Sequence, residues 1–195
     1  MKTKQRGLRN NFDELYTGHE ALGIESVYNF SHKILEYIYD NELRFGRSKT
    51  TFFGGLIFAS CRSKNKPINP QEISKYFGEQ KYIILATAKQ ISNNVDFVDN
   101  SPINWTAYLD DLCVHFSVSD ETKDRAIEIG EMGENKGIIS GRCTRSYAVA
   151  TLYASTCINS TKDRITQKEL YDYTGVSEST IRKIYKEQLG EYNNE

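Results

Sequence analysis

Hydroxyl-bearing and cationic side chains gather near the carboxyl end of this 195-residue chain, with a spacing that suits contact with nucleic acid. On a helix, most of them lie opposite the apolar residues Ile181 and Ile184. The guanidinium of Arg182 could chelate O6 and N7 of guanine, a contact that discriminates between bases by roughly 1–3 kcal/mol. Lysine ammonium groups are suited to phosphate oxygens. We therefore predict that DNA is bound by Ser177, Ser179, Thr180, Arg182, Lys183 and Lys186.

Residues 166–189 have the pattern of two helices joined by a glycine turn. Thr166 and Glu169 have capping-box spacing. Gly175 permits the tight turn, and Ser177 is placed to cap the second helix. The side chains expected to face inward are Leu170 and Tyr173. In a helix-turn-helix the second helix enters the major groove of DNA, and we favour that interpretation over an amphipathic helix that faces only solvent.

Other chemistries find no support in the sequence. The cysteines form no C-x2-C pair, and the three histidines do not complete a zinc-binding spacing. Because neither a Ser-His-Asp set nor a phosphate-binding glycine loop is present, we predict no enzymatic activity, no metal and no cofactor. No stretch of 18 uncharged apolar residues occurs, so we expect no membrane span.

The net charge of −1 hides an uneven distribution. Residues 1–75 carry 12 Lys/Arg against 8 Asp/Glu, residues 76–135 carry 4 against 11, and residues 136–195 carry 9 against 7. Because binding depends on local patches rather than on the total, this charge is compatible with a nucleic-acid partner.

An internal repeat organises the chain. Four residues recur 95 positions later, namely Gly46, Arg47, Ala59 and Ser60. Four more recur 97 positions later, namely Ile68, Glu72, Tyr76 and Gly78. An insertion of two residues in the loop at 158–164 accounts for the change of offset. The chain is therefore interpreted as a tandem duplication.

Four further cations precede the helix-turn-helix. They could form a patch for DNA phosphate or for an acidic partner, or they could be ordinary surface charge: Arg142, Arg145, Lys162 and Arg164. Because Arg47 recurs at Arg142, a shared structural role for this pair, such as capping or an internal ion pair, is favoured.

Apolar spacing within each repeat is helical. Helices are predicted at about 48–63, 103–116 and 143–158, with a further helix capped by Ser119. The first of these is apolar nearly all round and should be buried, with Gly54 and Gly55 marking a close helix crossing. We predict an all-α fold of two tandem five-helix repeats. The expected segments are a flexible basic terminus at 1–7, a first repeat at 8–95, a linker at 96–102 and a second repeat at 103–190.

This arrangement resembles the paired cyclin-like repeats of the transcription factor B family, known in eukaryotes as transcription initiation factor IIB, and is most like the archaeal form. The resemblance runs from about Leu8 to Leu189. In the first repeat it rests on ALGI at 21–24, FGRS at 45–48, LIFASCR at 56–62 and INPQEI at 68–73. In the second it rests on GIISGR at 137–142, AVATLYAS at 148–155, TQKEL at 166–170 and GVSESTIR at 175–182.

The resemblance implies binding to the TATA-binding protein on promoter DNA, with base contacts by Ser179 and Arg182, and recruitment of RNA polymerase. It also implies a location in the cytoplasm of an archaeon, associated with the nucleoid, or in the nucleus of a eukaryote. Residues 79–82 offer little positive charge for phosphate, which argues against strong downstream DNA contact by the first repeat.

One departure from the family leaves alternatives open, because the zinc ribbon with which the family docks on polymerase is not found in this sequence. The chain could be the core of a longer factor, or a ribbonless paralogue that acts as a regulator or competitor. A cyclin-type protein-binding module without DNA contact is the third interpretation.

Overall fold

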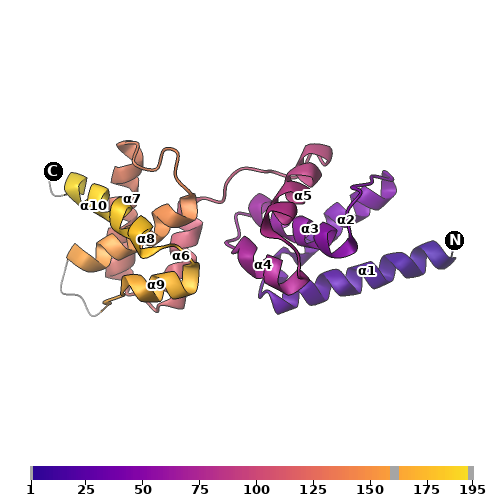
Figure 1. The fold of residues 1–195 in the computed structure, drawn as a ribbon, viewed down its shortest axis with the longest axis horizontal. Coiled ribbons are helices and arrows are strands. Elements are labelled where there is room, and N and C mark those ends of the chain that lie inside the picture. The colour runs from indigo at the N-terminus through magenta and orange to yellow at the C-terminus, as the bar shows by residue number, and fades with distance from the viewer. Residues whose placement is uncertain (1, 159–162, 193–195) are drawn as a thin grey trace. The chain divides into compact units, whose positions relative to one another are not determined.

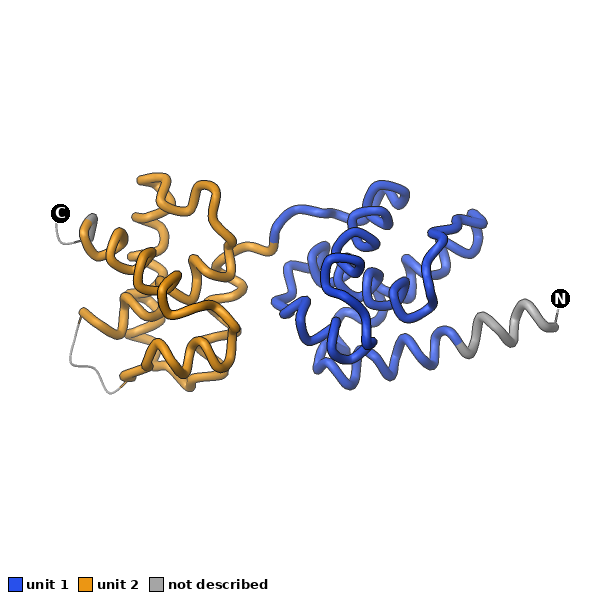
Figure 2. The backbone as a smooth tube through the Cα atoms, in the orientation of Figure 1, with its two compact units in different colours: residues 1–102 blue, residues 103–195 orange. Residues whose placement is uncertain are grey.

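The computed structural model describes the backbone of residues 2–158 and 163–192 and the side chains of residues 11–158 and 163–190. Ten α-helices, one short 3-10 helix and no strand occur in these residues (Figure 1). They fall into two compact units, residues 1–102 and residues 103–195 (Figure 2). The prediction of an all-α fold is confirmed for the described residues.

The first unit contains five α-helices in its described part. Their bounds are α1 Lys2–Ala21, α2 Tyr28–Asp40, α3 Lys49–Ser63, α4 Pro70–Phe77 and α5 Lys81–Asn94, with the 3-10 helix Glu25–Val27 before α2. The described part of the second unit contains five more. Their bounds are α6 Trp105–His115, α7 Asp120–Asn135, α8 Thr144–Ile158, α9 Gln167–Thr174 and α10 Glu178–Tyr192.

Helix α3 is the buried centre of the first unit and packs chiefly against α5. The predicted close crossing is confirmed at its two central glycines. A Cβ atom on Gly55 would lie 2.6 Å from Cγ2 of Thr87, and one on Gly54 would lie 3.2 Å from Cγ1 of Ile84. Larger residues at either position would force α3 and α5 apart, which explains why the helix tolerates glycine there.

Helix α8 has the same central place in the second unit, where it packs against α6, α7 and α10. Eight of its residues from Tyr147 to Ser155 are buried, and only Tyr153 in this stretch is partly exposed. Helix α7 begins after Ser119, whose hydroxyl oxygen accepts a hydrogen bond from the backbone N–H of Thr122, as its predicted capping role requires. The carboxylate of Asp163 also binds this helix start, at 2.8 Å from the hydroxyl of Thr122.

The helix bounds follow the repeat offsets found in the sequence. Helices α3 and α8 begin 95 residues apart, and α4 and α9 begin 97 residues apart. The two short helices end at corresponding glycines, Gly78 with φ of 66° and Gly175 with φ of 69°. Only glycine adopts this left-handed conformation without strain, so both turns depend on that residue type.

Helix α1 is assigned from Lys2 and so overlaps the segment 1–7, for which flexibility stays a prediction. No helix in the described part of the chain is both long enough and apolar enough to cross a membrane.

Candidate nucleic-acid interface

Helices α9 and α10 form the predicted helix-turn-helix, and a capping box starts the first of them. The backbone N–H of Glu169 donates to the hydroxyl oxygen of Thr166 at 3.2 Å, and the backbone N–H of Thr166 donates to the Glu169 carboxylate at 2.7 Å. Hydrogen bonds from the Thr166 hydroxyl and amide lower the pKa of Glu169. The carboxylate therefore stays ionised near neutral pH, and both hydrogen bonds of the capping box are formed.

The start of α10 is organised by the hydroxyl of Ser177. Its oxygen accepts a hydrogen bond from the backbone N–H of Thr180 at 3.3 Å and lies 2.8 Å from the hydroxyl oxygen of Thr180. The hydroxyl of Ser179 is 3.0 Å away. These contacts fit the capping role expected of Ser177 and tie the three predicted DNA-binding hydroxyl groups into one cluster at the helix start.

Arg182 lies on the exposed side of α10, and 54 % of its side chain is accessible to solvent. One guanidinium nitrogen donates to the side-chain oxygen of Gln167 at 3.3 Å, and the same nitrogen is 4.0 Å from the carboxylate of Glu178. Glu178 is exposed and Gln167 is partly exposed, so Arg182 is held at the surface, where a ligand could displace both partners. Lys183 and Lys186 are exposed as well, whereas Ile181 and Ile184 on the other face are buried.

Leu170 is fully buried as predicted, but the prediction that Tyr173 faces inward is wrong. Its side chain is 36 % exposed and its ring stacks on His115, with the ring centroids 3.5 Å apart. The Tyr173 hydroxyl also donates to the carboxylate of Asp111 at 3.2 Å. A polar surface stack thus replaces the expected core contact, because α6 presents His115 and Asp111 on the side where α9 docks.

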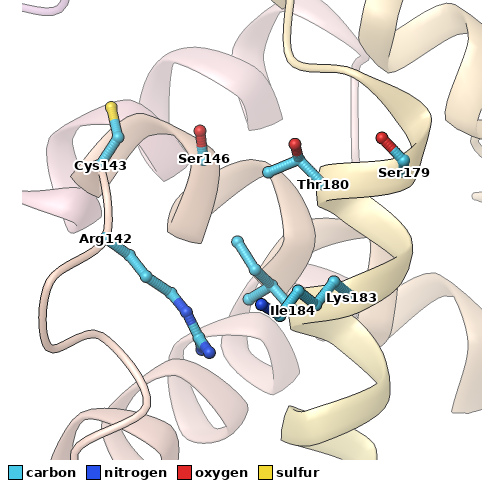
Figure 3. A pocket seen from close by; sticks show the side chains of 7 residues that line it. All are labelled: Arg142, Cys143, Ser146, Ser179, Thr180, Lys183 and Ile184. Atoms are coloured by element: carbon cyan, nitrogen blue, oxygen red, sulfur yellow. The ribbon is translucent and has the colours of Figure 1, made fainter.

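A pocket of about 550 Å³ lies between the first turns of α8 and α10 (Figure 3). Its lining combines two cations, three hydroxyl groups, a thiol and one aliphatic side chain: Arg142, Lys183, Ser146, Ser179, Thr180, Cys143 and Ile184. The helix start therefore brings three of the six predicted DNA-binding residues into one hollow. We call this the α8–α10 pocket.

Arg142 joins this pocket from the chain segment before α8. One of its terminal nitrogens, Nη2, donates to the Glu187 carboxylate at 2.6 Å. The other, Nη1, is inaccessible and has no hydrogen-bond partner among the described residues. Arg142 therefore forms an ion pair, but at the surface, because 42 % of the Glu187 side chain is exposed. Arg47, the corresponding residue of the first unit, instead lines a separate and largely apolar hollow of about 260 Å³.

Two other predicted cations, Arg145 and Arg164, do not line the α8–α10 pocket. Arg145 is partly buried in the first turn of α8, and its Nη1 also lacks a hydrogen-bond partner among the described residues. Arg164 is exposed just before α9. Lys162 lies outside the described residues. Of the three described residues of this predicted patch, Arg142 lines the pocket and Arg145 and Arg164 do not.

Three lining residues were not predicted as contacts: Cys143, Ser146 and Ile184. Their shared place at the α8–α10 contact depends on residues about 40 positions apart, which no local pattern reports. The repeat offset could have indicated Ser146, because it aligns with Thr51, one of the residues at the start of α3. No group of three or more potential metal ligands occurs in the described part of the chain.

Comparison with known proteins identifies the repeat that carries this site. Residues 98–191 match the family model of the transcription factor TFIIB repeat. Transcription initiation factor IIB 7 of Halobacterium salinarum is 29 % identical over 193 residues, covering 97 % of this chain and 59 % of the relative. Transcription initiation factor IIB of Archaeoglobus fulgidus is 29 % identical over 184 residues, which cover 94 % of this chain and 56 % of the relative. Residues 98–191 therefore form a TFIIB repeat, and archaeal transcription initiation factors IIB are similar to this chain over most of its length.

A third member of the transcription factor IIB family, transcription initiation factor IIB 1 of Thermoplasma volcanium, is 32 % identical over 142 residues, or 73 % of this chain and 45 % of the relative. The chain thus spans about half the length of the curated relatives that it matches. All three are archaeal proteins named as initiation factors, a family that does not catalyse reactions. The match to the TFIIB repeat includes α9, α10 up to residue 191, and the α8–α10 pocket.

Proposed function

We propose that this chain is the promoter-binding core of a transcription initiation factor. It binds the complex of the TATA-binding protein with promoter DNA, and α10 reads the recognition element in the major groove upstream of the TATA element. The observation that carries the proposal is the exposure of Arg182 on a helix whose other face is built into the core. The names of the archaeal relatives support the same role.

Each residue of the interface has a distinct task in this proposal. Arg182 reads guanine through a bidentate contact, after exchanging Gln167 and Glu178 for the base. Ser179 lies on the same side of α10 and makes the second base contact, while Lys183 and Lys186 bind phosphate. The hydroxyls of Ser177 and Thr180 position the start of the helix. Arg142, Arg145, Lys162 and Arg164 supply further contacts with phosphate or with the TATA-binding protein.

The test is a fluorescence-anisotropy titration of the chain into the TATA-binding protein bound to labelled promoter duplexes that differ only upstream of the TATA element. The wild-type chain should bind and should prefer some upstream sequences. Arg182→Ala should lose about 1–3 kcal/mol of that preference. Arg182→Lys is the matched control because it keeps the charge and loses the planar fork. It should retain the salt dependence of binding but lose the preference.

Two outcomes would contradict the proposal. Absence of binding by the wild-type chain at low salt would reject promoter binding and favour a protein-binding module of cyclin type. Equal binding of wild type and Arg182→Ala on every upstream sequence would reject the reading role of Arg182. The salt concentration must be fixed and varied deliberately, since phosphate contacts release counterions.

A further inference from the structure

The central helices of the two units begin after corresponding glycine turns. The groups that contact the first turn of each helix are different. Helix α3 begins at Lys49 and α8 begins at Thr144, 95 residues later. Each follows a glycine in the left-handed region, Gly46 with φ of 59° and Gly141 with φ of 72°. The first unit can therefore serve as an internal reference for what the start of α8 accepts.

In the first unit the start of α3 holds an anion that the chain itself supplies. The Glu79 carboxylate accepts hydrogen bonds from the hydroxyls of Thr50 at 2.5 Å and Ser48 at 2.9 Å. Bonds from the Thr50, Ser48 and Thr51 hydroxyls lower the pKa of Glu79, so the group is ionised at neutral pH. A carboxylate is the expected occupant of a helix start, where backbone N–H groups and the helix dipole favour negative charge.

The second unit does not supply the same anion. At the offset of 97, the residue corresponding to Glu79 is Val176, which is 5 % exposed and belongs to the apolar core. The capping hydroxyl of Ser48 is replaced by Cys143, whose thiol is a weak acceptor. The start of α8 therefore has neither the carboxylate nor the serine cap that complete the start of α3.

Positive charge and hydroxyl groups have been gained at the same place. Lys183 corresponds to Ala86 of the first unit, and Thr180 corresponds to Ile83. Both line the α8–α10 pocket together with Ser146 (Figure 3). No carboxylate of the described residues forms an ion pair with Lys183, whereas Arg142 is already paired with Glu187. Relative to the first unit, the site has exchanged a built-in anion for an available cation.

We infer that the α8–α10 pocket binds a phosphate group in the place that the Glu79 carboxylate takes in the first unit. Lys183 supplies the charge, Thr180 and Ser146 supply hydroxyl donors, and the first turn of α8 supplies backbone N–H groups. If α10 enters the groove of promoter DNA, as the proposed function holds, the ligand is a phosphodiester group of that DNA. This assignment rests on the proposed function. This contact fixes the register of α10, so that Arg182 meets its base.

Three variants separate binding from folding. Lys183→Gln removes the charge at an exposed position, and Lys183→Arg retains it as the matched control. Ser146→Asp places a carboxylate in the third position of α8, where it should stabilise the helix start and exclude phosphate. A residue with a purely structural role would not give a variant that is as stable as wild type yet binds DNA less well.

The first arm of the test follows backbone amide signals by NMR while inorganic phosphate is added to the whole chain. The amides of Ser146 and Thr180 should shift in the wild type and in Lys183→Arg, and should not shift in Lys183→Gln or Ser146→Asp. The second arm measures binding to the TATA-binding protein on promoter DNA at several salt concentrations. The slope of log K against log salt should be shallower by about 0.9 in Lys183→Gln. Affinity should fall at least ten-fold in Ser146→Asp.

The outcomes distinguish the inference from the function on which it rests. Wild-type binding to DNA with no amide shifts on addition of phosphate, and with an unchanged slope in Lys183→Gln, would overturn the pocket and the phosphate contact of Lys183. It would leave standing the binding of the promoter complex and the reading of bases by Arg182. Phosphate shifts without any binding to the promoter complex would overturn the proposed function and leave a site for free phosphate. Amide shifts on addition of phosphate, together with an unchanged salt dependence of DNA binding in Lys183→Gln, would overturn the assignment of the ligand to the DNA backbone. Loss of both effects in Lys183→Gln, with retention in Lys183→Arg, supports the inference.

Discussion

The hydroxyl group of Tyr147 donates a hydrogen bond to the backbone carbonyl oxygen of Gly130, at 2.6 Å, inside the second unit. The indole ring of Trp105 packs on the same glycine, so a Cβ atom there would lie 2.3 Å from Trp105 Cη2. The Trp105 and Tyr147 rings meet edge to face with centroids 5.6 Å apart. Helices α6, α7 and α8 therefore converge at a point that has no room for a side chain.

Substitution of this glycine should destabilise the second unit. In Gly130→Ala the new methyl group must displace a buried indole ring, and overpacking of this kind costs about 1–3 kcal/mol. Gly190→Ala is the control, because nothing lies within 4 Å of a Cβ atom at that position of α10. It should stabilise the chain by about 0.5–1 kcal/mol through helix propensity. Urea denaturation of both variants measures the two changes, and a loss of equal size in each would refute the packing argument.

Acid should weaken the first unit through His19, which is fully buried. Its Nδ1 lies 2.8 Å from the carbonyl oxygen of Leu15 and must donate, so in the neutral ring Nε2 accepts from the Ser31 hydroxyl, also at 2.8 Å. Burial lowers the pKa of His19 below its ordinary value of 6.5. The unfolded chain therefore binds a proton more readily than the folded chain, and the free energy of unfolding should fall as the pH drops below about 6.5.

The measurement for His19 is urea denaturation at pH 7.5 and at pH 5.5. Wild type should lose more stability between these two values than His19→Gln, which keeps polar groups at the site and does not titrate. An equal loss in both proteins would assign the acid sensitivity to other groups.

The helix-turn-helix should depend on the capping hydroxyl of Thr166. Thr166→Ala removes the acceptor of the Glu169 N–H and should lower the free energy of unfolding by about 0.5–2 kcal/mol. Thr166→Ser keeps the hydroxyl and should stay close to wild type. Thermal denaturation followed by circular dichroism compares them, and matching curves for the alanine and serine variants would show that the capping box contributes nothing.

Loss of Glu187 should strengthen DNA binding, because this carboxylate neutralises Arg142 beside the α8–α10 pocket. Glu187→Gln should raise the affinity for the promoter complex several-fold and steepen its salt dependence by up to about 0.9 in slope. Glu20→Gln, an equal change of charge on α1 in the first unit, should have a smaller effect. A smaller affinity in Glu187→Gln than in wild type would mean that the ion pair positions Arg142 for binding instead of restraining it.

Helices with strong local signals could be predicted from the sequence. Ser119 and Thr166 indicated the starts of their helices, because each capping contact involves only residues one turn away. Gly54 and Gly55 indicated that another helix crosses α3 closely. Two glycines lower the stability of a buried helix, and a lack of space for side chains explains their presence. The basic face of α10 followed from its 3.6-residue period alone.

The features that escaped prediction depend on distant residues. The Glu79 carboxylate reaches Ser48 across 31 residues, and Arg142 reaches Glu187 across 45. Tyr173 was expected in the core because its apolar ring suited the helical pattern, but the surface of α6 supplied His115 as a stacking partner. Neither kind of contact leaves a periodic trace, so only three-dimensional placement reveals it.

The apolar cores of the two units have no residue in common, since one is drawn from residues 12–98 and the other from residues 105–185. Each copy of the duplicated bundle consequently carries its own means of folding. A substitution in the core of one unit therefore removes no residue from the core of the other. One copy could keep an acidic group at its helix start while the other exchanged that group for affinity toward a polyanion.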